Sequence, residues 1–170
     1  MRLCLLNATR CSILASSHRM SDAGVVRLLL FRVGTLVCAA DAERVREILP
    51  RLETTRIPGA PPPVAGLVNV RGTLITVVEG WRALRQPEPP ASNGTHHGTT
   101  VLLEVGGGRK VLGFTVDEVV DLLALSAEAL DRRQALPGID PTLVRAVGRR
   151  AGQLFVVLDT DALLTPILSS

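Results

Sequence analysis

The stretch that decides the fold is PGAPPPVAGLVNVRGTLITVVEGWRAL, residues 58–84, because its pattern returns as PGIDPTLVRAVGRRAGQLFVVLDTDALL, residues 137–164. Both stretches open with Pro-Gly, run through a Val-rich segment to a turn that ends in Gly, and return along a second apolar segment to an acidic residue. Gly72 matches Gly152 and Glu79 matches Asp159, about 80 positions later in each case. A repeat of this length predicts a duplicated structural unit.

The segments that precede these stretches also correspond. VRLLLFRVGTLVCAADAERVREIL resembles VLLEVGGGRKVLGFTVDEVVDLL, so that Val45 and Glu47 stand where Val119 and Asp121 stand. The Pro-, Gly-, Ser- and Thr-rich piece between the two copies is typical of a surface connection. We therefore predict one domain over residues 24–168, with a first barrel at about 24–85, a linker over 86–99 and a second barrel at about 100–168. The pattern leaves open an exchange of strands between the two barrels.

Each copy reads as five short strands rich in Val, Leu and Ile and separated by Gly or Pro. A five-stranded unit of this size closes into a small barrel, which removes its sheet edges. In LITVVEG, Leu74 and Val78 alternate with Ile75 and Val77, which predicts that both faces of this strand are buried. The fold class is therefore all-β, two five-stranded barrels packed on a shared hydrophobic core. The expected strands are 26–33, 36–40, 45–52, 64–71, 73–79, 100–106, 109–117, 119–125, 142–148 and 153–158, and the expected short helices are 41–45, 80–85 and 160–165.

Residues 1–23 are expected to be a flexible N-terminal tail. The apolar pieces of residues 1–19 are interrupted by polar residues, so they match neither a secretory signal nor a membrane span. We expect Met20 to be the natural start and residues 1–19 to be an upstream extension. Cys38, in an apolar strand-like run, would then be the sole cysteine of the working protein and most simply a small buried hydrophobe. A reducing, cytoplasmic setting is the default for such cysteine usage.

The Arg-Gly turn at Arg71 and Gly72 carries the main functional hypothesis. Strand alternation puts Asn69 and Arg71 on a polar face, and Gly72 suits a tight hairpin turn that needs positive φ. The second copy has Ala151-Gly152 at the same place, so the turn needs its Gly but not its Arg. Arg71 is then either a solubilising surface residue or a polar anchor on a binding face, where Arg is enriched.

Searches for reactive or metal-binding clusters find little. The adjacent His96 and His97 lack Cys, Asp or Glu at ligand spacing and are interpreted as loop residues. Asp117, Glu118 and Asp121 have no His or Arg beside them in sequence to complete an acid–base set. No nucleophile elbow or phosphate-binding glycine loop is present in the sequence. A binding module without catalytic residues, cofactor or metal fits these observations best.

A small-barrel nucleic-acid-binding protein is the alternative from another class. The net charge of +3 and the pI near 9.2 favour it, and Arg supplies almost all of the positive charge. Against it, aromatic residues are only 2% of the chain and the arginines are interspersed with acids. Arg149-Arg150 is a tight basic spot within the expected domain.

The chain resembles the CheW family of bacterial chemotaxis coupling proteins over about residues 26–168. The resemblance is carried by LLLFRVG, AERVREIL, IPGAPPPVAGLVNVRGTLITVVE, GFTVDEVVDLLAL and GQLFVVLDTDALL. It implies two SH3-like barrels and a cytoplasmic scaffold, recruited to receptor arrays at the inner membrane. Its partners would be the CheW-like regulatory domain of a chemotaxis histidine kinase and the cytoplasmic hairpin tip of methyl-accepting chemoreceptors, with no nucleic acid bound and no membrane insertion.

The resemblance also implies which residues bind partners. Val45, Glu47, Gly66, Asn69, Arg71 and Gly72 would lie on or beside the binding surfaces, and Val116, Val119 and Leu122 would line the groove between the barrels. The family usually has Pro-Val-x-Asp-Leu-Arg after the Arg-Gly turn, whereas this chain has Thr76 to Trp81, TVVEGW. This departure and the long linker indicate a divergent member, which could serve a chemotaxis-like pathway of surface motility.

Overall fold

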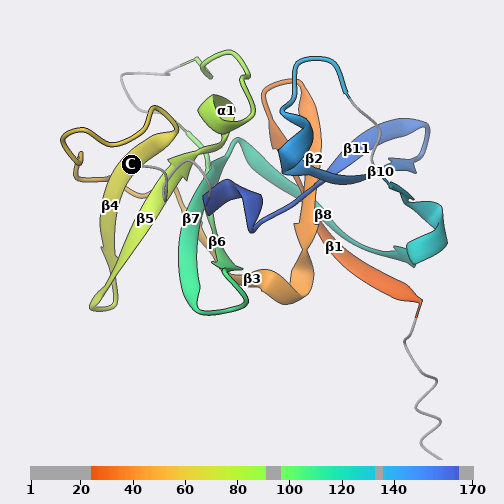
Figure 1. Cartoon of the computed structure of the whole chain (residues 1–170), viewed down its shortest axis with the longest axis horizontal. Coiled ribbons are helices and arrows are strands. Elements are labelled where there is room, and N and C mark those ends of the chain that lie inside the picture. Colours follow the sequence, from red (N-terminus) through yellow and green to blue (C-terminus); the bar gives the residue numbers. More distant parts are fainter. Residues whose placement is uncertain (1–23, 91–96, 133–135, 165–170) are drawn as a thin grey trace, which may run out of the picture.

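The computed structural model describes residues 24–90, 97–132 and 136–164; the expected tail over 1–23 and His96 lie outside these ranges. The all-β prediction is confirmed (Figure 1). The strands are β1 (Val25–Val33), β2 (Leu36–Asp41), β3 (Val45–Pro50), β4 (Val64–Val70), β5 (Thr73–Glu79), β6 (Thr99–Val105), β7 (Lys110–Val116), β8 (Glu118–Ser126), β9 (Asp131–Arg132), β10 (Val144–Arg150) and β11 (Gln153–Leu158). The helices are α1 (Gly80–Ala83) and the 3-10 turns η1 (Ala42–Arg44), η2 (Ala127–Ala129), η3 (Pro141–Leu143) and η4 (Ala162–Leu164).

All ten strands expected from the sequence are present, and the three expected helices correspond to η1, α1 and η4. The strand β9 and the turns η2 and η3 were not expected. Strand β9 has only two residues, which pair with Ala146 and Val147 of β10, and so short a segment leaves no alternation pattern in the sequence.

The strands form two sheets with the same internal order. We call the sheet β8-β1-β2-β11-β10-β9 barrel A and the sheet β3-β6-β7-β5-β4 barrel B. Barrel A takes the first two strands of the first repeat copy and the last four strands of the second, β8 to β11, and barrel B takes the remainder (Figure 1). The two copies, about 24–85 and 100–168, thus each contribute strands to both sheets rather than forming one sheet each.

Each sheet contains one parallel pair of strands, and that pair joins a strand of one copy to a strand of the other. In barrel A the joint is β2 beside β11, and in barrel B it is β5 beside β7. Every other pair of neighbouring strands in the two sheets is antiparallel. Parallel neighbours cannot be joined by a tight hairpin, so each must come from a distant part of the chain. The long connection between the copies supplies that distance.

A shared hydrophobic core lies between the barrels. It contains buried residues of both sheets, among them Phe31 of β1 and Phe114 of β7, whose rings meet edge to face with centroids 5.9 Å apart. A smaller cluster around Phe155 fills the interior of barrel A. The few aromatic residues of the chain are therefore concentrated where they bury the most apolar area.

One burial prediction for β5 was wrong. Ile75, Val77 and Val78 are buried, but Leu74 is 68% exposed. Leu74 pairs with Asn69 close to the hairpin turn, where both strands extend beyond the core. The equivalent Leu154 of β11 is also largely exposed, so the repeat places an apolar side chain at both hairpin tips.

The end of β5 departs from the family pattern without breaking the strand. The strand runs to Glu79 and passes directly into α1. A Cβ on Gly80 would lie 2.2 Å from the carbonyl oxygen of Thr115, so only glycine permits α1 to pack this closely on β7. Glu79 is itself buried, and its carboxylate accepts hydrogen bonds from Arg51 at 2.6 Å and from the Thr115 hydroxyl at 2.9 Å.

Candidate partner-binding site

The hairpin tip between β4 and β5 is a tight turn with two residues in the left-handed region. Arg71 has φ +51° and Gly72 has φ +86°, the signature of the hairpin turn with positive φ at both central positions. The turn between β10 and β11 repeats it, with Ala151 at +47° and Gly152 at +80°. The prediction that Gly72 adopts positive φ is confirmed. Asn69 supports its turn, because its side-chain oxygen accepts a hydrogen bond from the Gly72 N–H at 2.8 Å.

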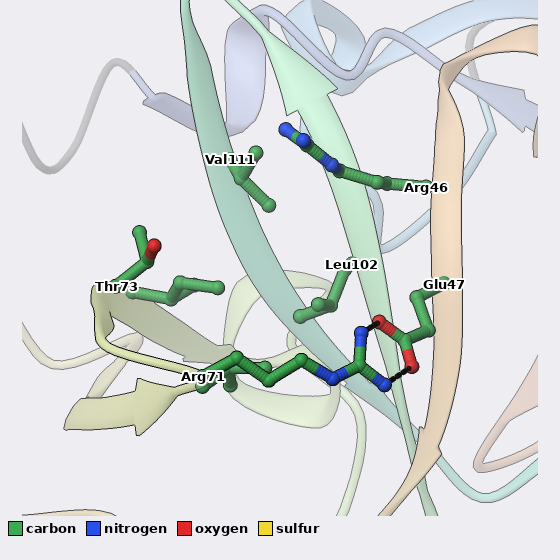
Figure 2. A pocket seen from close by; sticks show the side chains of 8 residues that line it. Arg46, Glu47, Arg71, Thr73, Leu102 and Val111 are labelled. Carbon is green, nitrogen blue, oxygen red and sulfur yellow. Dashed lines mark hydrogen bonds and ion pairs between the residues drawn. The ribbon is translucent and has the colours of Figure 1, made fainter.

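Arg71 forms a forked ion pair with Glu47. The two guanidinium nitrogens donate to the two carboxylate oxygens at 2.9 and 2.7 Å (Figure 2). Glu47 belongs to β3 and Arg71 directly follows β4, and these are the two edge strands of barrel B. The pair therefore bridges the seam where the sheet closes on itself, at its solvent-exposed end.

The second copy has an equivalent ion pair, which the sequence comparison missed. Arg150 at the end of β10 pairs with Asp121 of the edge strand β8, so barrel A is bridged in the same way between β8 and β10, beyond the residues of β10 that pair with the two-residue strand β9. The turn itself forms without an arginine, since Ala151 adopts the same positive φ as Arg71, but the ion pair recurs all the same. The charge has moved one residue upstream, from the turn position that Arg71 holds to the last strand position. Both barrels have an ion pair across the seam. The charge of Arg71 alone therefore does not distinguish the first copy from the second.

A shallow hollow lies beside each ion pair. In barrel B its cavity volume is about 180 Å³ (Figure 2). A hollow of the same volume occupies the corresponding end of barrel A. The linings correspond position by position: Ile75 to Phe155, Leu102 to Leu30, and Val111 to Val37. We call them the barrel B hollow and the barrel A hollow.

The predicted groove residues differ in accessibility. Val45 and Val119 occupy matching places and pack, partly buried, against the shared core. Val116 is only 2% exposed, so it supports this region from beneath. Leu122 is 61% exposed and pairs with Leu29, a residue of the shared core, so it extends the core's face to the surface.

Ile48 is a further exposed apolar residue, which the sequence comparison did not single out. It occupies in β3 the place of Leu122 in β8, pairs with the core residue Val101, and is 44% exposed. The match of Val45 with Val119 already aligned these positions in the sequence, so the same comparison could have found it. Ile48 and Leu122 give the region between the barrels an exposed apolar side chain from each edge strand.

Gly66 has a structural explanation of its own. Its φ of +152° lies outside the range that side chains ordinarily adopt. A Cβ there would lie 2.2 Å from the carbonyl oxygen of Thr55, whose backbone pairs with Leu67 through hydrogen bonds of 2.8 and 2.9 Å. Gly66 therefore permits the segment before β4 to lie against this strand.

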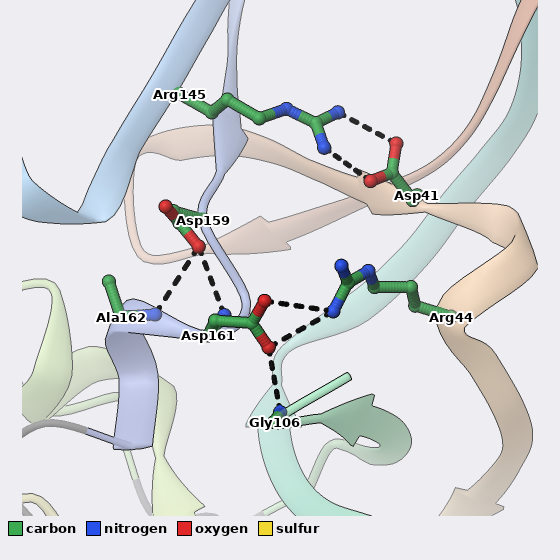
Figure 3. A network of polar contacts seen from close by, with 7 residues as sticks. All are labelled: Asp41, Arg44, Gly106, Arg145, Asp159, Asp161 and Ala162. Carbon is green, nitrogen blue, oxygen red and sulfur yellow. Dashed lines mark hydrogen bonds and ion pairs between the residues drawn. The ribbon is translucent and has the colours of Figure 1, made fainter. Parts of the chain in front are cut away.

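A polar network fixes η1 and η4 against both barrels (Figure 3). Asp161 accepts a hydrogen bond from Arg44 at 3.0 Å and another from the N–H of Gly106, in the β6–β7 turn, at 2.7 Å. Asp159 accepts hydrogen bonds from the N–H groups of Asp161 and of Ala162, the first residue of η4. Asp41 pairs with Arg145, and this hydrogen bond raises the pKa of the guanidinium, which stays charged. These acids thus have structural partners.

The carboxylates of the β7–β8 region are likewise separated by their partners. Asp117 accepts a hydrogen bond from the Gly34 N–H at 2.7 Å, Glu118 pairs with Arg32 at 2.6 Å, and Asp121 pairs with Arg150. Within residues 24–90, 97–132 and 136–164, no three potential ligand side chains converge as a metal site would require. In the same ranges, no helix has the length and apolar character to cross a membrane.

Known proteins resemble this chain in sequence and in fold. Residues 27–167 match the model of the CheW-like domain family. A probable chemotaxis protein CheW of Rhizobium etli is 30% identical over 128 residues, 75% of this chain and 77% of that protein. Chemotaxis protein CheW of Klebsiella aerogenes is 26% identical over 141 residues, 81% of this chain and 80% of that protein. The crystal structure of the scaffolding protein TtCheW from Thermoanaerobacter tengcongensis superimposes with a TM-score of 0.73 at 18% identity, covering 82% of this chain and 92% of that one, and shares its fold.

Proposed function

The chain belongs to the CheW-like family, and on this premise we propose that it is a non-enzymatic adaptor that couples chemoreceptors to a chemotaxis-type histidine kinase. Family membership supports an adaptor role in chemotaxis signalling. Its proposed partners are the kinase's CheW-like regulatory domain and the receptor's cytoplasmic hairpin tip. The protein acts in the cytoplasm, where it joins receptor arrays at the membrane.

The observation that carries the proposal is the arrangement of exposed apolar surface in three places. Each barrel end has a hollow beside an ion pair, and the region between the barrels exposes Ile48 and Leu122. Surfaces with an apolar centre and charged pairs at the rim are typical of transient protein–protein interfaces. A protein that must hold two partners at once needs separate surfaces of this kind.

The shapes of the partners suggest how the surfaces are used. A receptor tip is a helical hairpin, and an amphipathic helix binds by laying its apolar face into a groove. We assign it to the surface between the barrels, with Val45, Ile48, Val119 and Leu122 as contacts and Val116 beneath. The regulatory domain of the kinase is built like this chain, so we assign it to a barrel end, with Glu47 and Arg71 at the rim and Gly66, Asn69 and Gly72 holding the hairpin in place.

Co-sedimentation of the purified protein with a receptor fragment and a kinase tests the proposal. We expect the wild type to join the pellet and Arg71→Glu to lose about tenfold in affinity for the kinase regulatory domain, because two carboxylates then face each other at the rim. The matched control is the charge-swapped pair Glu47→Arg with Arg71→Glu, which restores the seam bridge but reverses the charges offered to the partner. It should fold like the wild type and still bind weakly.

Thermal unfolding separates binding from folding in this experiment. Exposed ion pairs contribute about 0–1 kcal/mol, so the single variant should remain folded. The adaptor proposal is contradicted if the wild type does not co-sediment with either partner, or if Arg71→Glu binds as the wild type does. The nucleic-acid alternative has no support from the family match, and arginines that suggested it, including Arg150, are held in ion pairs.

A further inference from the structure

One difference between the two barrel ends concerns the extra residue of an edge strand, which lines the hollow of each barrel. The edge strands β3 and β8 each contain a β-bulge, an extra residue that the neighbouring strand does not match. In β3 the register passes from Val45 to Glu47, which leaves Arg46 as the extra residue. In β8 it passes from Val119 to Asp121, which leaves Val120. Bulges redirect a side chain at the rim of a barrel, and Arg46 and Val120 each line the hollow of their own barrel.

The barrel B hollow therefore has an uncompensated positive charge. Arg71 is neutralised by its forked pair with Glu47. Arg46 extends from β3 towards Val111, on the other side of the hollow from that pair (Figure 2). No acidic side chain in the described part of the chain pairs with its guanidinium, which is exposed. Beneath it the lining is apolar, formed by Val70, Ile75, Leu102 and Val111.

The barrel A hollow has the same apolar floor without that charge. Arg150, on its rim, is neutralised by Asp121, and Val120 stands where Arg46 stands in the other barrel. Leu154, 46% exposed, adds a further apolar side chain to the lining. The same fold thus offers two ends of equal cavity volume and different electrostatics.

We propose that Arg46 is the residue that makes the barrel B end selective for a protein surface presenting an apolar side chain beside a carboxylate. The apolar side chain enters the hollow and the carboxylate accepts a charge-assisted hydrogen bond from the Arg46 guanidinium. The barrel A end, with Val120 and Leu154, selects a surface that offers apolar side chains alone, since a buried carboxylate there would have no cation to pair with.

This assignment gives the two ends different partners despite their common ancestry in the repeat. Specificity is a difference of affinities, and an unpaired charge is an effective way to reject the wrong surface. A single residue at a bulge can set that difference, because it changes neither the hairpin nor the ion pair that closes the seam. The inference rests on the proposed adaptor function, since it names the chemistry of the surface that the barrel B end binds.

The repeat itself provides the matched variants. Arg46→Val gives the barrel B end the residue of barrel A, and Val120→Arg does the reverse. Arg46→Lys retains a positive charge. The probe is the purified CheW-like regulatory domain of a chemotaxis-type kinase, added to the full chain, with dissociation constants measured at 50 and 300 mM NaCl. Melting temperatures of the variants are measured in parallel, and because Arg46 is exposed and unpaired, Arg46→Val should melt as the wild type does.

We expect Arg46→Val to weaken binding by about tenfold at 50 mM salt and to reduce the salt dependence, because the lost contact is electrostatic. Arg46→Lys should recover most of the affinity. Val120→Arg should bind the probe no more tightly than the wild type. If the wild type binds and Arg46→Val binds equally well with the same salt dependence, the inference is overturned alone. It is also overturned if Val120→Arg strengthens binding and steepens its salt dependence. Failure of the wild type to bind would overturn the adaptor proposal and this inference together.

Discussion

Two glycines of one hairpin, Gly66 and Gly72, carry different physical constraints. Gly72 needs its freedom only for the φ of +86° in the turn, and no atom stands where a Cβ would go. Gly66 has a φ of +152° and a carbonyl oxygen 2.2 Å from that position. One glycine is required by the backbone alone, and the other by the backbone and a neighbouring segment.

Alanine substitutions should separate these constraints. Gly66→Ala is expected to reduce the free energy of unfolding by about 3 kcal/mol or more, because the Thr55 segment must shift to admit a methyl group. Gly72→Ala should cost about 1 kcal/mol, the strain of an alanine in the left-handed region. Urea denaturation of the full chain measures both. Equal losses would contradict the close approach at Gly66, and they would also reopen the possibility that Gly66 acts by contacting a partner directly.

The thiol of Cys38 is expected to be inert in the folded protein. Burial leaves Cys38 with no exposed surface and raises its pKa to about 12, so almost no thiolate exists at pH 8. A protein with Cys4 and Cys11 replaced by Ser should react with a chromogenic disulfide reagent only after guanidinium unfolds it. The unfolded chain releases the thiol proton near pH 9 and the folded chain does not, so the contribution of Cys38 to stability is lost as pH rises from about 9 towards 12. Rapid labelling at pH 8 under native conditions would contradict this prediction.

At the scale of the strand and the hairpin, alternation and turn residues were sufficient to predict the ten longer strands, but not which strands pair with each other. The hairpin β4–β5 was readable because Val-rich segments flank a turn that requires positive φ. Its counterpart β10–β11 was readable from the repeat. No local sequence pattern predicts the parallel pairing of β5 with β7, because the composition of a strand does not identify the strand beside it.

The ion pairs across the seams also depend on tertiary contacts that the local sequence does not reveal. By position in the repeat, Arg71 corresponds to Ala151, which has no charge. In three dimensions the requirement is that a guanidinium reach the acid of the opposite edge strand, and Arg150 satisfies it from one residue earlier. A requirement met through space tolerates a shift of one position along the chain, and a position-by-position comparison misses it. Ile48, by contrast, could have been found by applying the repeat more thoroughly.

At the scale of the whole molecule, the interlaced topology means that neither repeat copy contains a complete sheet. Residues 1–90 include β1 and β2 of barrel A and β3, β4 and β5 of barrel B. Without the second copy, β3 loses its partner β6, and the hairpins β1–β2 and β4–β5 lose the strands that flank them. Isolated two-stranded hairpins are marginal in water, and the shared core would lose Phe114 against Phe31.

Fragments of the chain should therefore fold only together. Residues 1–90 and residues 91–170, produced separately, are each expected to give the poorly dispersed amide spectrum of an unfolded chain. Produced in the same cells, they should co-purify as a one-to-one complex that unfolds in a single cooperative transition, because the β2–β11 and β5–β7 contacts join the fragments in both barrels. The melting temperature should lie below that of the intact chain, since the connection no longer reduces the entropy lost on association. Cooperative unfolding of either fragment alone would mean that one repeat copy can close a barrel by itself, and the exchange of strands would then be an arrangement the protein could do without.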